Sequence, residues 1–399
     1  MTRALWMALL LLVLAGCQRQ QVAAPPLGQH SFAAYQQQTR DWLLAHRAFQ
    51  TLDKSGELAW NSPQEWRTAG RAHKGILLVH GLGDSPGSFS DIGPALAKQG
   101  FLVRTVLLPG HGTRPEDMLA VTVDDWRQVV REQAAILASE VDTLWLGGFS
   151  TGANLALEYA VGHDADGLLL FSPAFKSDTR YDFLAPALAL FRDWLRPRSE
   201  VFPQQIATRY LRVPTNGFAQ FWYTSATARR LLAAQPFTKP VVMVLAEHDS
   251  VLDTRWMLDR FDEDFPHPAS RLIWYGNPRP AQQAASRVLV RTDYLPDERI
   301  SQFSHMSVLF SPDNPLYGRA GRERLCANGQ SEAFAQRCLK GEAVWYSDWG
   351  FQAEDKVHAR LTWNPWFSWQ EAVIGAVVNG TPLPAPVAGA QAYPPYEQY

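Results

Sequence analysis

Short apolar runs alternate with helix-like stretches through the middle of the chain, and this alternation restricts the possible folds more than any other feature. The runs at 75–79 (GILLV), 143–148 (TLWLGG) and 167–171 (GLLLF) predict buried strands, whereas 123–140 has helical periodicity. Strands separated by helices favour a parallel sheet with helices on both faces. We therefore predict an α/β fold with a mostly parallel central sheet. Further strands are predicted at 101–108 and 240–245, and a further helix at 152–161.

The alternation stops between residues 174 and 237. This segment contains several prolines and aromatic residues at irregular spacing, which predicts a helical cap inserted above the strand ends. Its apolar side chains could line an acyl-chain pocket or only pack the cap onto the core, and the sequence leaves both interpretations open. The predicted organisation is a core in two parts, 51–173 and 238–380, the cap at 174–237, and a Pro-rich tail at 381–399.

The composition is that of a globular protein with no excess of basic residues. Hydrophobic residues make up 46% of the 399 residues and charged residues 19%. Lys and Arg total 37 against 39 for Asp and Glu, a formal net charge of −2. A nucleic-acid partner is therefore not expected, because nothing in the balance favours binding to phosphate backbones.

The N-terminus has the pattern of a targeting segment. The apolar run Ala4–Ala15 follows Arg3 and is too short to span a bilayer, but it suits a signal peptide. It leads into Leu-Ala-Gly-Cys17, which resembles a bacterial lipobox. The resemblance implies a signal peptide at 1–16, a diacylglycerol on Cys17 that anchors the protein to a membrane, and a tether with a first helix at 17–50. The alternative is an ordinary signal peptide with a chance cysteine.

The residue after Cys17 and the two other cysteines bear on location. In lipoproteins that this chain resembles, Gln18 in place of Asp favours the outer membrane, with the protein facing the periplasm. Cys326 and Cys338 can pair in only one way, and an oxidising periplasm predicts a disulfide between them. Two free thiols would be expected instead in a cytosolic protein. A zinc site is not expected, because no second Cys or His pair accompanies them.

The segment 148–152 (GFSTG) matches G-x-S-x-G and lies between a predicted strand and a predicted helix, where a nucleophile turn requires it. Ser150 would then be exposed at the turn, and the N–H of Thr151 would face a developing oxyanion. A second match, 83–87 (GDSPG), has proline after the serine. Because Pro86 has no N–H to donate, we interpret this second match as a loop.

Two glycine-rich segments follow predicted strands. In His80-Gly-Leu-Gly, the N–H of Leu82 is a candidate for the second oxyanion donor. His80 ends its strand directly, and His111 lies in a Pro-Gly-His-Gly segment. We predict a structural role for both histidines.

Five stretches in order now identify a resemblance. Between His80 and Val308 the chain reads HGLGDSPGSF, LLPGHG, GGFSTGANLALEYA, VVMVLAEHDSVLD and SHMSV. These stretches resemble the α/β-hydrolases, in the serine hydrolase group that includes carboxylesterases, monoacylglycerol lipases and serine aminopeptidases. The resemblance implies an α/β-hydrolase fold with a helical cap and a Ser, Asp, His triad in that chain order.

The resemblance assigns the other two triad members. It places the acid at Asp249, with Asp253 as the alternative, which could instead be a helix N-cap. It places the base at His305 in a late loop, and a long interval before it suggests an inserted loop at 276–287. His267 comes too early, His248 adjoins the acid, and His358 falls in a charged stretch that we expect to be solvated.

These assignments predict a serine hydrolase that cleaves small-molecule carboxylic esters, which could be lipid-derived, through an acyl-enzyme, without metal or organic cofactor. A peptidase or amidase of the same fold is the first alternative. It would use acidic cap residues to hold a substrate ammonium, and the candidates are Asp178, Asp182, Asp193 and Glu200. The second alternative is a non-catalytic envelope scaffold.

Overall fold

A twisted sheet runs through the centre of the protein, which we describe from a computed structural model covering residues 25–277, 287–353 and 355–384. Within this part of the chain, eight strands lie in the order β1-β3-β2-β4-β5-β6-β7-β8. β1 is antiparallel to β3, and every other neighbouring pair is parallel. The strands are β1 (Glu65–Trp66), β2 (Lys74–Val79), β3 (Phe101–Val106), β4 (Thr143–Phe149), β5 (Gly167–Phe171), β6 (Val241–Ala246), β7 (Arg271–Tyr275) and β8 (Val288–Arg291).

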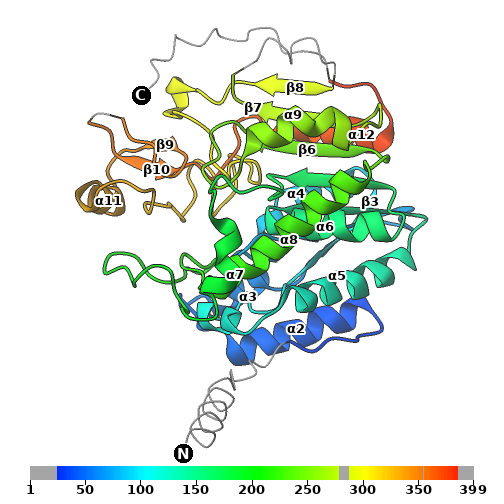
Figure 1. Ribbon diagram of the computed structural model, residues 1–399, viewed down its shortest axis with the longest axis horizontal. Coiled ribbons are helices and arrows are strands. Elements are labelled where there is room, and N and C mark those ends of the chain that lie inside the picture. The colour runs from blue at the N-terminus through cyan, green and yellow to red at the C-terminus, as the bar shows by residue number, and fades with distance from the viewer. Residues whose placement is uncertain (1–24, 278–286, 354, 385–399) are drawn as a thin grey trace, which may run out of the picture.

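Helices cover both faces of this sheet (Figure 1). The central strands β5 and β6 are apolar along their whole length because each face is buried under helices. The α-helices are α2 (Phe32–His46), α3 (Lys54–Asn61), α4 (Ile92–Lys98), α5 (Val123–Ala138), α6 (Thr151–Gly162), α7 (Ala185–Leu188), α8 (Thr215–Ala234), α9 (Thr254–Asp264), α11 (Glu332–Leu339) and α12 (Phe367–Asn379). Short 3₁₀ helices are η1 (Pro86–Phe89), η2 (Pro115–Leu119), η3 (Asp182–Leu184) and η4 (Pro296–Glu298).

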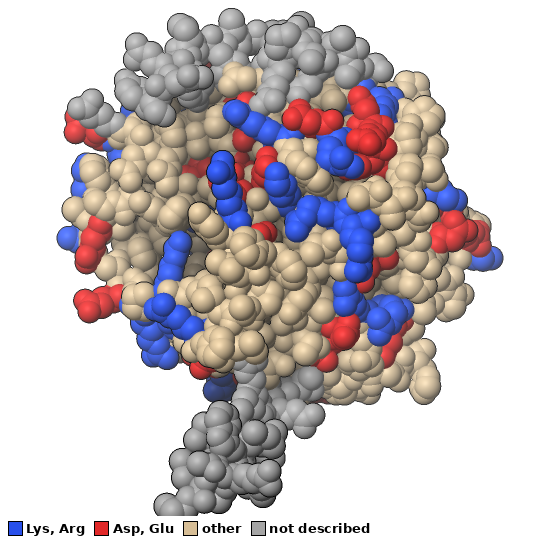
Figure 2. Space-filling view, in the orientation of Figure 1, with Lys and Arg blue, Asp and Glu red and all other residues tan. Residues whose placement is uncertain are grey.

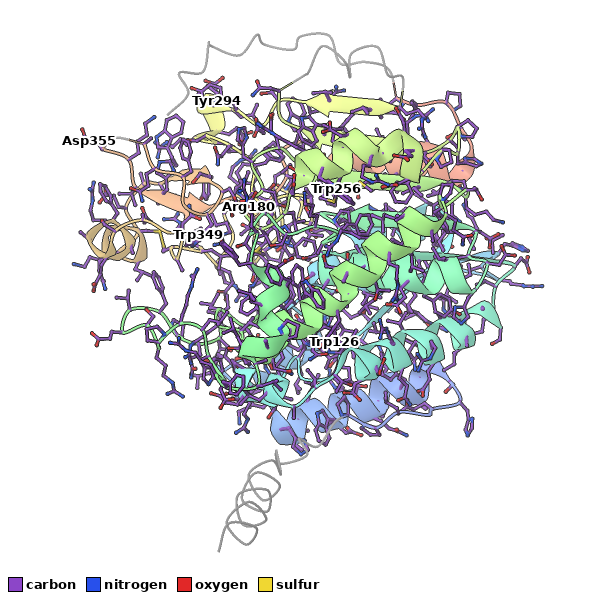
Figure 3. All side chains as sticks on the ribbon, viewed as in Figure 1. Trp126, Arg180, Trp256, Tyr294, Trp349 and Asp355 are labelled. Carbon is purple, nitrogen blue, oxygen red and sulfur yellow. A yellow bond between two sulfur atoms is a disulfide. The ribbon has the colours of Figure 1, made fainter. Side chains whose placement is uncertain are left out.

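Two large apolar clusters form the core, one on each side of the sheet. Trp126 of α5 is fully buried in the first cluster, and its indole N–H donates to the carbonyl of Pro109 (Figure 3). Leu78, Phe303 and Ile374 belong to the second cluster, so α12 and the loop after η4 close that face. The predicted α/β fold with a mostly parallel sheet is confirmed.

The segment predicted as a cap contains η3, α7 and α8. α8 packs along α6, which follows the Ser150 turn. α7 packs on α8 through small side chains, since Ala185, Ala189 and Ala219 form a buried cluster. The large apolar residues of the α7 region therefore face outward.

A small second sheet follows the main one in sequence and was not anticipated. β9 (Trp345–Ser347) and β10 (His358–Arg360) pair in parallel beside α11 (Figure 1). A disulfide joins Cys326 and Cys338, as the sequence predicts, and ties α11 to the preceding loop. The expectation for His358 was wrong: its side chain is buried, and neither ring nitrogen has a hydrogen-bond partner among the described residues.

The two ends of the described chain add little to the sheet. Ser31 caps α2 by accepting a hydrogen bond from the N–H of Ala34, as its position before the apolar run suggested. The predicted signal peptide, Cys17 and most of the predicted tail lie outside the described residues. None of the helices that the structure describes has the length and apolar character needed to cross a membrane.

Candidate active site

Ser150 lies in a tight turn between β4 and α6. Its backbone has φ 55° and ψ −119°, a region that a non-glycine residue enters only when its surroundings enforce it. Its N–H donates to the carbonyl of Phe171 on β5 (3.0 Å), and its own carbonyl accepts from the N–H of Ala174 (3.2 Å). The turn is thus held by the neighbouring strand and by the start of the cap segment.

The two glycines of the G-x-S-x-G motif allow this turn to pack against backbone. A Cβ at Gly152 would lie 1.9 Å from the carbonyl oxygen of Val79, at the end of β2. A Cβ at Gly148 would lie 2.4 Å from the carbonyl carbon of Gly152. Neither contact can be relieved by a side-chain rotation, so the spacing of the motif follows from strand and helix backbones in direct contact.

His305 and Asp249 form a hydrogen-bonded pair. The imidazole Nδ1 lies 2.6 Å from Asp249 Oδ2, and the carboxylate is shielded from solvent. The other oxygen, Oδ1, accepts from the N–H groups of Val251 (2.8 Å) and Leu252 (3.2 Å), which fixes the carboxylate in its loop. The imidazole packs against the ring of Phe149, with centroids 4.8 Å apart. Since Phe149 directly precedes Ser150, this contact brings His305 close to the Ser150 turn.

The loop after β2 carries the predicted second oxyanion donor, Leu82. Among the described residues, neither the N–H of Leu82 nor that of Thr151 has a hydrogen-bond partner. Two buried histidines hold this loop. His80 Nε2 accepts from the N–H of Leu108 (3.1 Å), and His111 Nε2 accepts from the N–H of Gly83 (3.0 Å).

These contacts explain why the two histidines stay neutral. Burial lowers the pKa of His80 to about 4. Burial, with the neighbouring His80, lowers the pKa of His111 to about 3. A neutral imidazole can accept a backbone hydrogen bond, whereas an imidazolium cannot. The geometry therefore agrees with the structural role predicted for both residues.

The rejected candidates have other partners. Ser85 of the second G-x-S-x-G match has extended backbone and donates its hydroxyl to the carbonyl of Thr208. A short 3₁₀ helix, η1, begins after it, although no helical pattern was expected there. Asp253 caps α9 and lies 2.8 Å from Lys176, so it does not face His305. His248 pairs with Asp293 at 2.6 Å.

Sequence reasoning missed one buried carboxylate beside the pair. Asp348 follows β9, and its Oδ2 accepts from the N–H of Ser250 at 2.6 Å. Its Oδ1 accepts a longer hydrogen bond from the N–H of His305 (3.4 Å). No motif surrounds Asp348, and it reaches the site only because β9 pairs next to the loop that holds the base.

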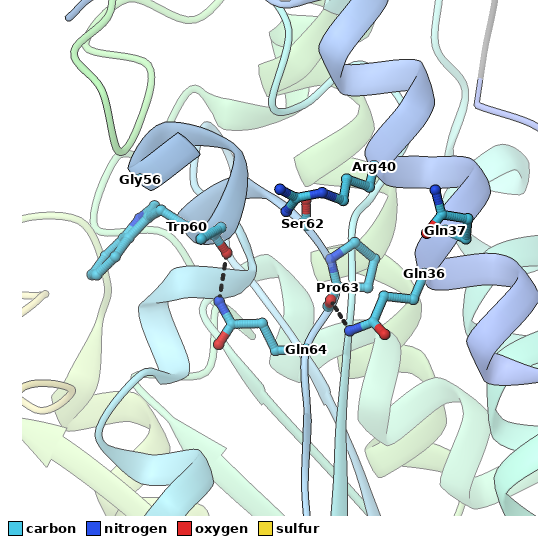
Figure 4. Close-up of a pocket in the computed structure, with 9 residues that line it drawn as sticks. Gln36, Gln37, Arg40, Gly56, Trp60, Ser62, Pro63 and Gln64 are labelled. Carbon is cyan, nitrogen blue, oxygen red and sulfur yellow. Dashed lines mark hydrogen bonds between the residues drawn. The ribbon is translucent and has the colours of Figure 1, made fainter. Parts of the chain in front are cut away.

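A groove elsewhere on the surface does not include the pair. A cavity of about 490 Å³ lies between α2 and α3, and its lining includes Gln36, Trp60 and Gln64 (Figure 4). Gln36 and Gln64 already donate to backbone carbonyls there. Its lining residues include neither a histidine nor a carboxylate that could activate a serine nucleophile. Among the described residues, no group of three or more His, Cys, Asp or Glu side chains is placed to hold a metal ion.

Known proteins share parts of this chain. Residues 70–276, just over half of it, match the family model described as serine aminopeptidase, S33. The thermostable monoacylglycerol lipase of Bacillus sp. (strain H-257) is 39% identical over 89 residues, which is 22% of this chain and 36% of the lipase. The pimeloyl-[acyl-carrier protein] methyl ester esterase of Sodalis glossinidius (strain morsitans) is 29% identical over 53% of this chain and 78% of its own length.

Solved structures are similar at lower identity. A soluble variant of monoglyceride lipase from Saccharomyces cerevisiae covers 54% of this chain and 81% of its own, with a TM-score of 0.43 and 17% identity. The family match itself spans β2 to β7, including the Ser150 turn and Asp249. With the sheet order described above, it shows that the chain belongs to the serine aminopeptidase S33 family of α/β-hydrolases.

Proposed function

We propose that this protein is a serine hydrolase that cleaves carboxylic esters through an acyl-enzyme. The observation that carries the proposal is the strained Ser150 turn beside a shielded His305–Asp249 pair. Strained nucleophile turns persist when catalysis needs an exposed hydroxyl at a helix N-terminus. The monoacylglycerol lipase and methyl ester esterase relatives favour esters over other acyl substrates.

In the proposed mechanism, Ser150 attacks the acyl carbonyl while His305 takes its proton. The bond from Nδ1 to Asp249 leaves Nε2 of the imidazole as the proton acceptor and stabilises the imidazolium. The N–H groups of Leu82 and Thr151 receive the oxyanion, and loss of such a donor costs about 3 kcal/mol of transition-state stabilisation. His305 then protonates the leaving alcohol, and water attacks the acyl-enzyme by the reverse steps.

The exposed surface of the cap segment favours apolar, lipid-derived esters as the substrates. Phe191 and Leu190 are 88% and 73% exposed, and Phe183 is also exposed nearby in sequence. Arg192 and Arg196 are exposed among them. Figure 2 shows Lys and Arg side chains spread over the visible face, with Asp and Glu side chains and uncharged surface among them. A patch of this kind suits contact with apolar substrate chains and lipid headgroups.

We further propose that the protein is anchored through lipidated Cys17 in the outer membrane and faces the periplasm. The support is the lipobox-like Leu-Ala-Gly-Cys17 sequence, and the disulfide fits an oxidising compartment. Metabolic labelling with a palmitate analogue should mark the wild type and leave Cys17→Ala unmarked. Equal labelling of both proteins would exclude the anchor at Cys17.

The activity is tested with p-nitrophenyl esters of increasing chain length, on the full-length protein in detergent. We expect hydrolysis by the wild type, and a loss of at least about a thousandfold in Ser150→Ala. A fluorophosphonate probe should label the wild type and not the variant. A wild type that neither hydrolyses esters nor reacts with the probe would support a scaffold instead.

Two further experiments define the substrate class. Leu190→Ser with Phe191→Ser should lower kcat/KM for long-chain esters and leave short-chain esters unchanged, because only long chains reach the patch. Leu52→Ser changes a fully exposed leucine between α2 and α3 and serves as the control. The family description, serine aminopeptidase, favours peptide-bond cleavage as the competing activity. Hydrolysis of aminoacyl p-nitroanilides tests for it. Cleavage of these amides without ester cleavage would make the protein a peptidase.

A further inference from the structure

The acid and base lie on separate loops, and a third segment touches both. The acid loop, 247–253, follows β6, and the base loop, 301–310, follows η4. Asp348, with 1% of its surface exposed, accepts backbone N–H groups from Ser250 in the first loop and from His305 in the second. The shorter bond, 2.6 Å from the Ser250 nitrogen, has the length of a charge-assisted hydrogen bond.

The backbone around Asp348 is itself held in place. Tyr346 of β9 donates its N–H to the carbonyl of Arg299 (2.7 Å), and its carbonyl accepts from the N–H of Ser301 (2.8 Å). The amide of Asn328 donates to the carbonyl of Asp348 and to the hydroxyl of Ser347. Trp349, the next residue, lies beside the small sheet (Figure 3). Asp348 therefore reaches the two loops from a fixed support.

Charged and polar groups of the acid loop and of β10 face Asp348. Asp249 adjoins it from the acid loop, and burial together with that carboxylate raises the pKa of Asp348. The Ser250 N–H and the buried guanidinium of Arg360 on β10 act in the opposite direction. His248, which pairs with Asp293, also lies near Asp348, and the charges of both carboxylates raise the pKa of His248. A buried carboxylate that accepts two N–H groups near a cation keeps its charge at a lower cost than an isolated one.

We propose that Asp348 is a positioning residue that holds the acid loop and the base loop in register, so that His305 and Asp249 stay aligned with Ser150. The proposal rests on the proposed hydrolase function. Asp348 bonds to the backbone N–H groups of Ser250 and His305, so it acts through the two backbones.

The test compares Asp348→Asn and Asp348→Ala with Asp313→Asn in the full-length protein. Asp313 is an exposed carboxylate in the same C-terminal segment, so its variant makes the same charge change without touching the loops. Active-site titration with a fluorophosphonate counts the reactive serines, and kcat is expressed per titrated site. kcat and KM are determined separately for each variant.

We expect kcat per site to fall about 10- to 100-fold in Asp348→Asn, because small misplacements of catalytic groups cost that much, while KM stays within about twofold. Asp348→Ala should lower kcat per site further, since both N–H groups lose their acceptor. If the alanine variant does not fold, the result for Asp348→Asn decides the test.

Two results would overturn the role of Asp348. One is a kcat per titrated site in Asp348→Asn equal to that of Asp313→Asn. The other is a loss explained entirely by fewer titratable sites and a lower melting temperature, which would indicate folding alone. Failure of the wild type to react with the probe would instead overturn the hydrolase function on which the proposal rests.

Discussion

The glycines of α6 have very different surroundings, although they lie on one helix. Gly152 faces the carbonyl of Val79, whereas a Cβ at Gly162, at the helix end, would meet nothing within 4 Å. We expect Gly152→Ala to destabilise the protein by about 3 kcal/mol or more, because backbone would have to move. Gly162→Ala should be neutral or slightly stabilising, since alanine favours helix. Urea unfolding of both variants checks this, and similar midpoints would contradict it.

The two neutral histidines that hold the loop after β2 predict a dependence of stability on pH. The folded-state pKa of His111, about 3, is below its unfolded value near 6.5. Its contribution is complete above about pH 6.5 and is lost as pH falls toward the folded pKa, because the unfolded chain then binds more protons.

We expect the melting temperature of the wild type to fall between pH 6.5 and 4. His111→Gln should be less stable at neutral pH but should fall less over this range, because glutamine does not titrate. Melting curves at several pH values measure both slopes. Equal slopes would mean that His111 does not contribute to acid instability.

The candidate site was predictable where chemistry leaves a local pattern. Gly148 and Gly152 mark the Ser150 turn because backbone contact permits no side chain there. Asp249 and His305 follow from the order of the family, and the structure pairs them. Asp348 left no pattern, because its partners are backbone N–H groups 98 and 43 residues away, which any sequence supplies.

At the scale of elements, the disulfide-linked segment supports the small sheet. Cys326 and Cys338 close a short loop that includes Asn328, which holds the backbone of Asp348. Replacing both cysteines by serine should lower stability by about 3 kcal/mol, in line with loops of this size. Activity should fall by more than the change in folded fraction, since the support of Asp348 loosens.

The measurement is kcat per titrated site, with and without reductant, beside thermal unfolding. In the wild type, reductant should lower stability and kcat per site as the double cysteine-to-serine variant does. In that variant, reductant should change neither. Unchanged activity per site would show that the small sheet keeps Asp348 in place without the covalent bond.

Strands were predicted well in the centre of the sheet and poorly at its edges. The buried runs of β2, β4, β5 and β6 are apolar without interruption, so the sequence marks them. β1 has two residues, and β8 is only partly buried and follows the predicted inserted loop, of which 278–286 lie outside the described residues. β9 and β10 have three residues each and depend on tertiary contacts.

At the scale of the whole molecule, one buried ion pair ties three regions together. Arg47, after α2, lies 2.8 Å from Glu57 of α3, with both side chains shielded. The same guanidinium donates to the carbonyl of Gly112 in the core and to that of Ala207 in the cap segment. The N-terminal helices are thereby joined to the cap and to the core.

Arg47→Ala should destabilise the protein by about 3 to 5 kcal/mol, because it leaves the Glu57 carboxylate buried without its cation. Arg71→Ala removes an arginine from an exposed pair with Asp142 and should cost less than about 1 kcal/mol. Denaturant unfolding of the two variants compares them. A small loss in Arg47→Ala would mean that water replaces the guanidinium.

The late position of Asp348 in the chain has a consequence for maturation. A chain that crosses a membrane from its N-terminus presents Ser150 first, then Asp249 and His305, and Asp348 almost two hundred residues after the nucleophile. If Asp348 has the role we propose, a partly emerged chain carries all three triad groups without the carboxylate that aligns them. If the protein is exported as we propose, its full hydrolytic rate would then arise only after translocation is nearly complete, and a partly exported chain would be a weaker esterase than the finished protein.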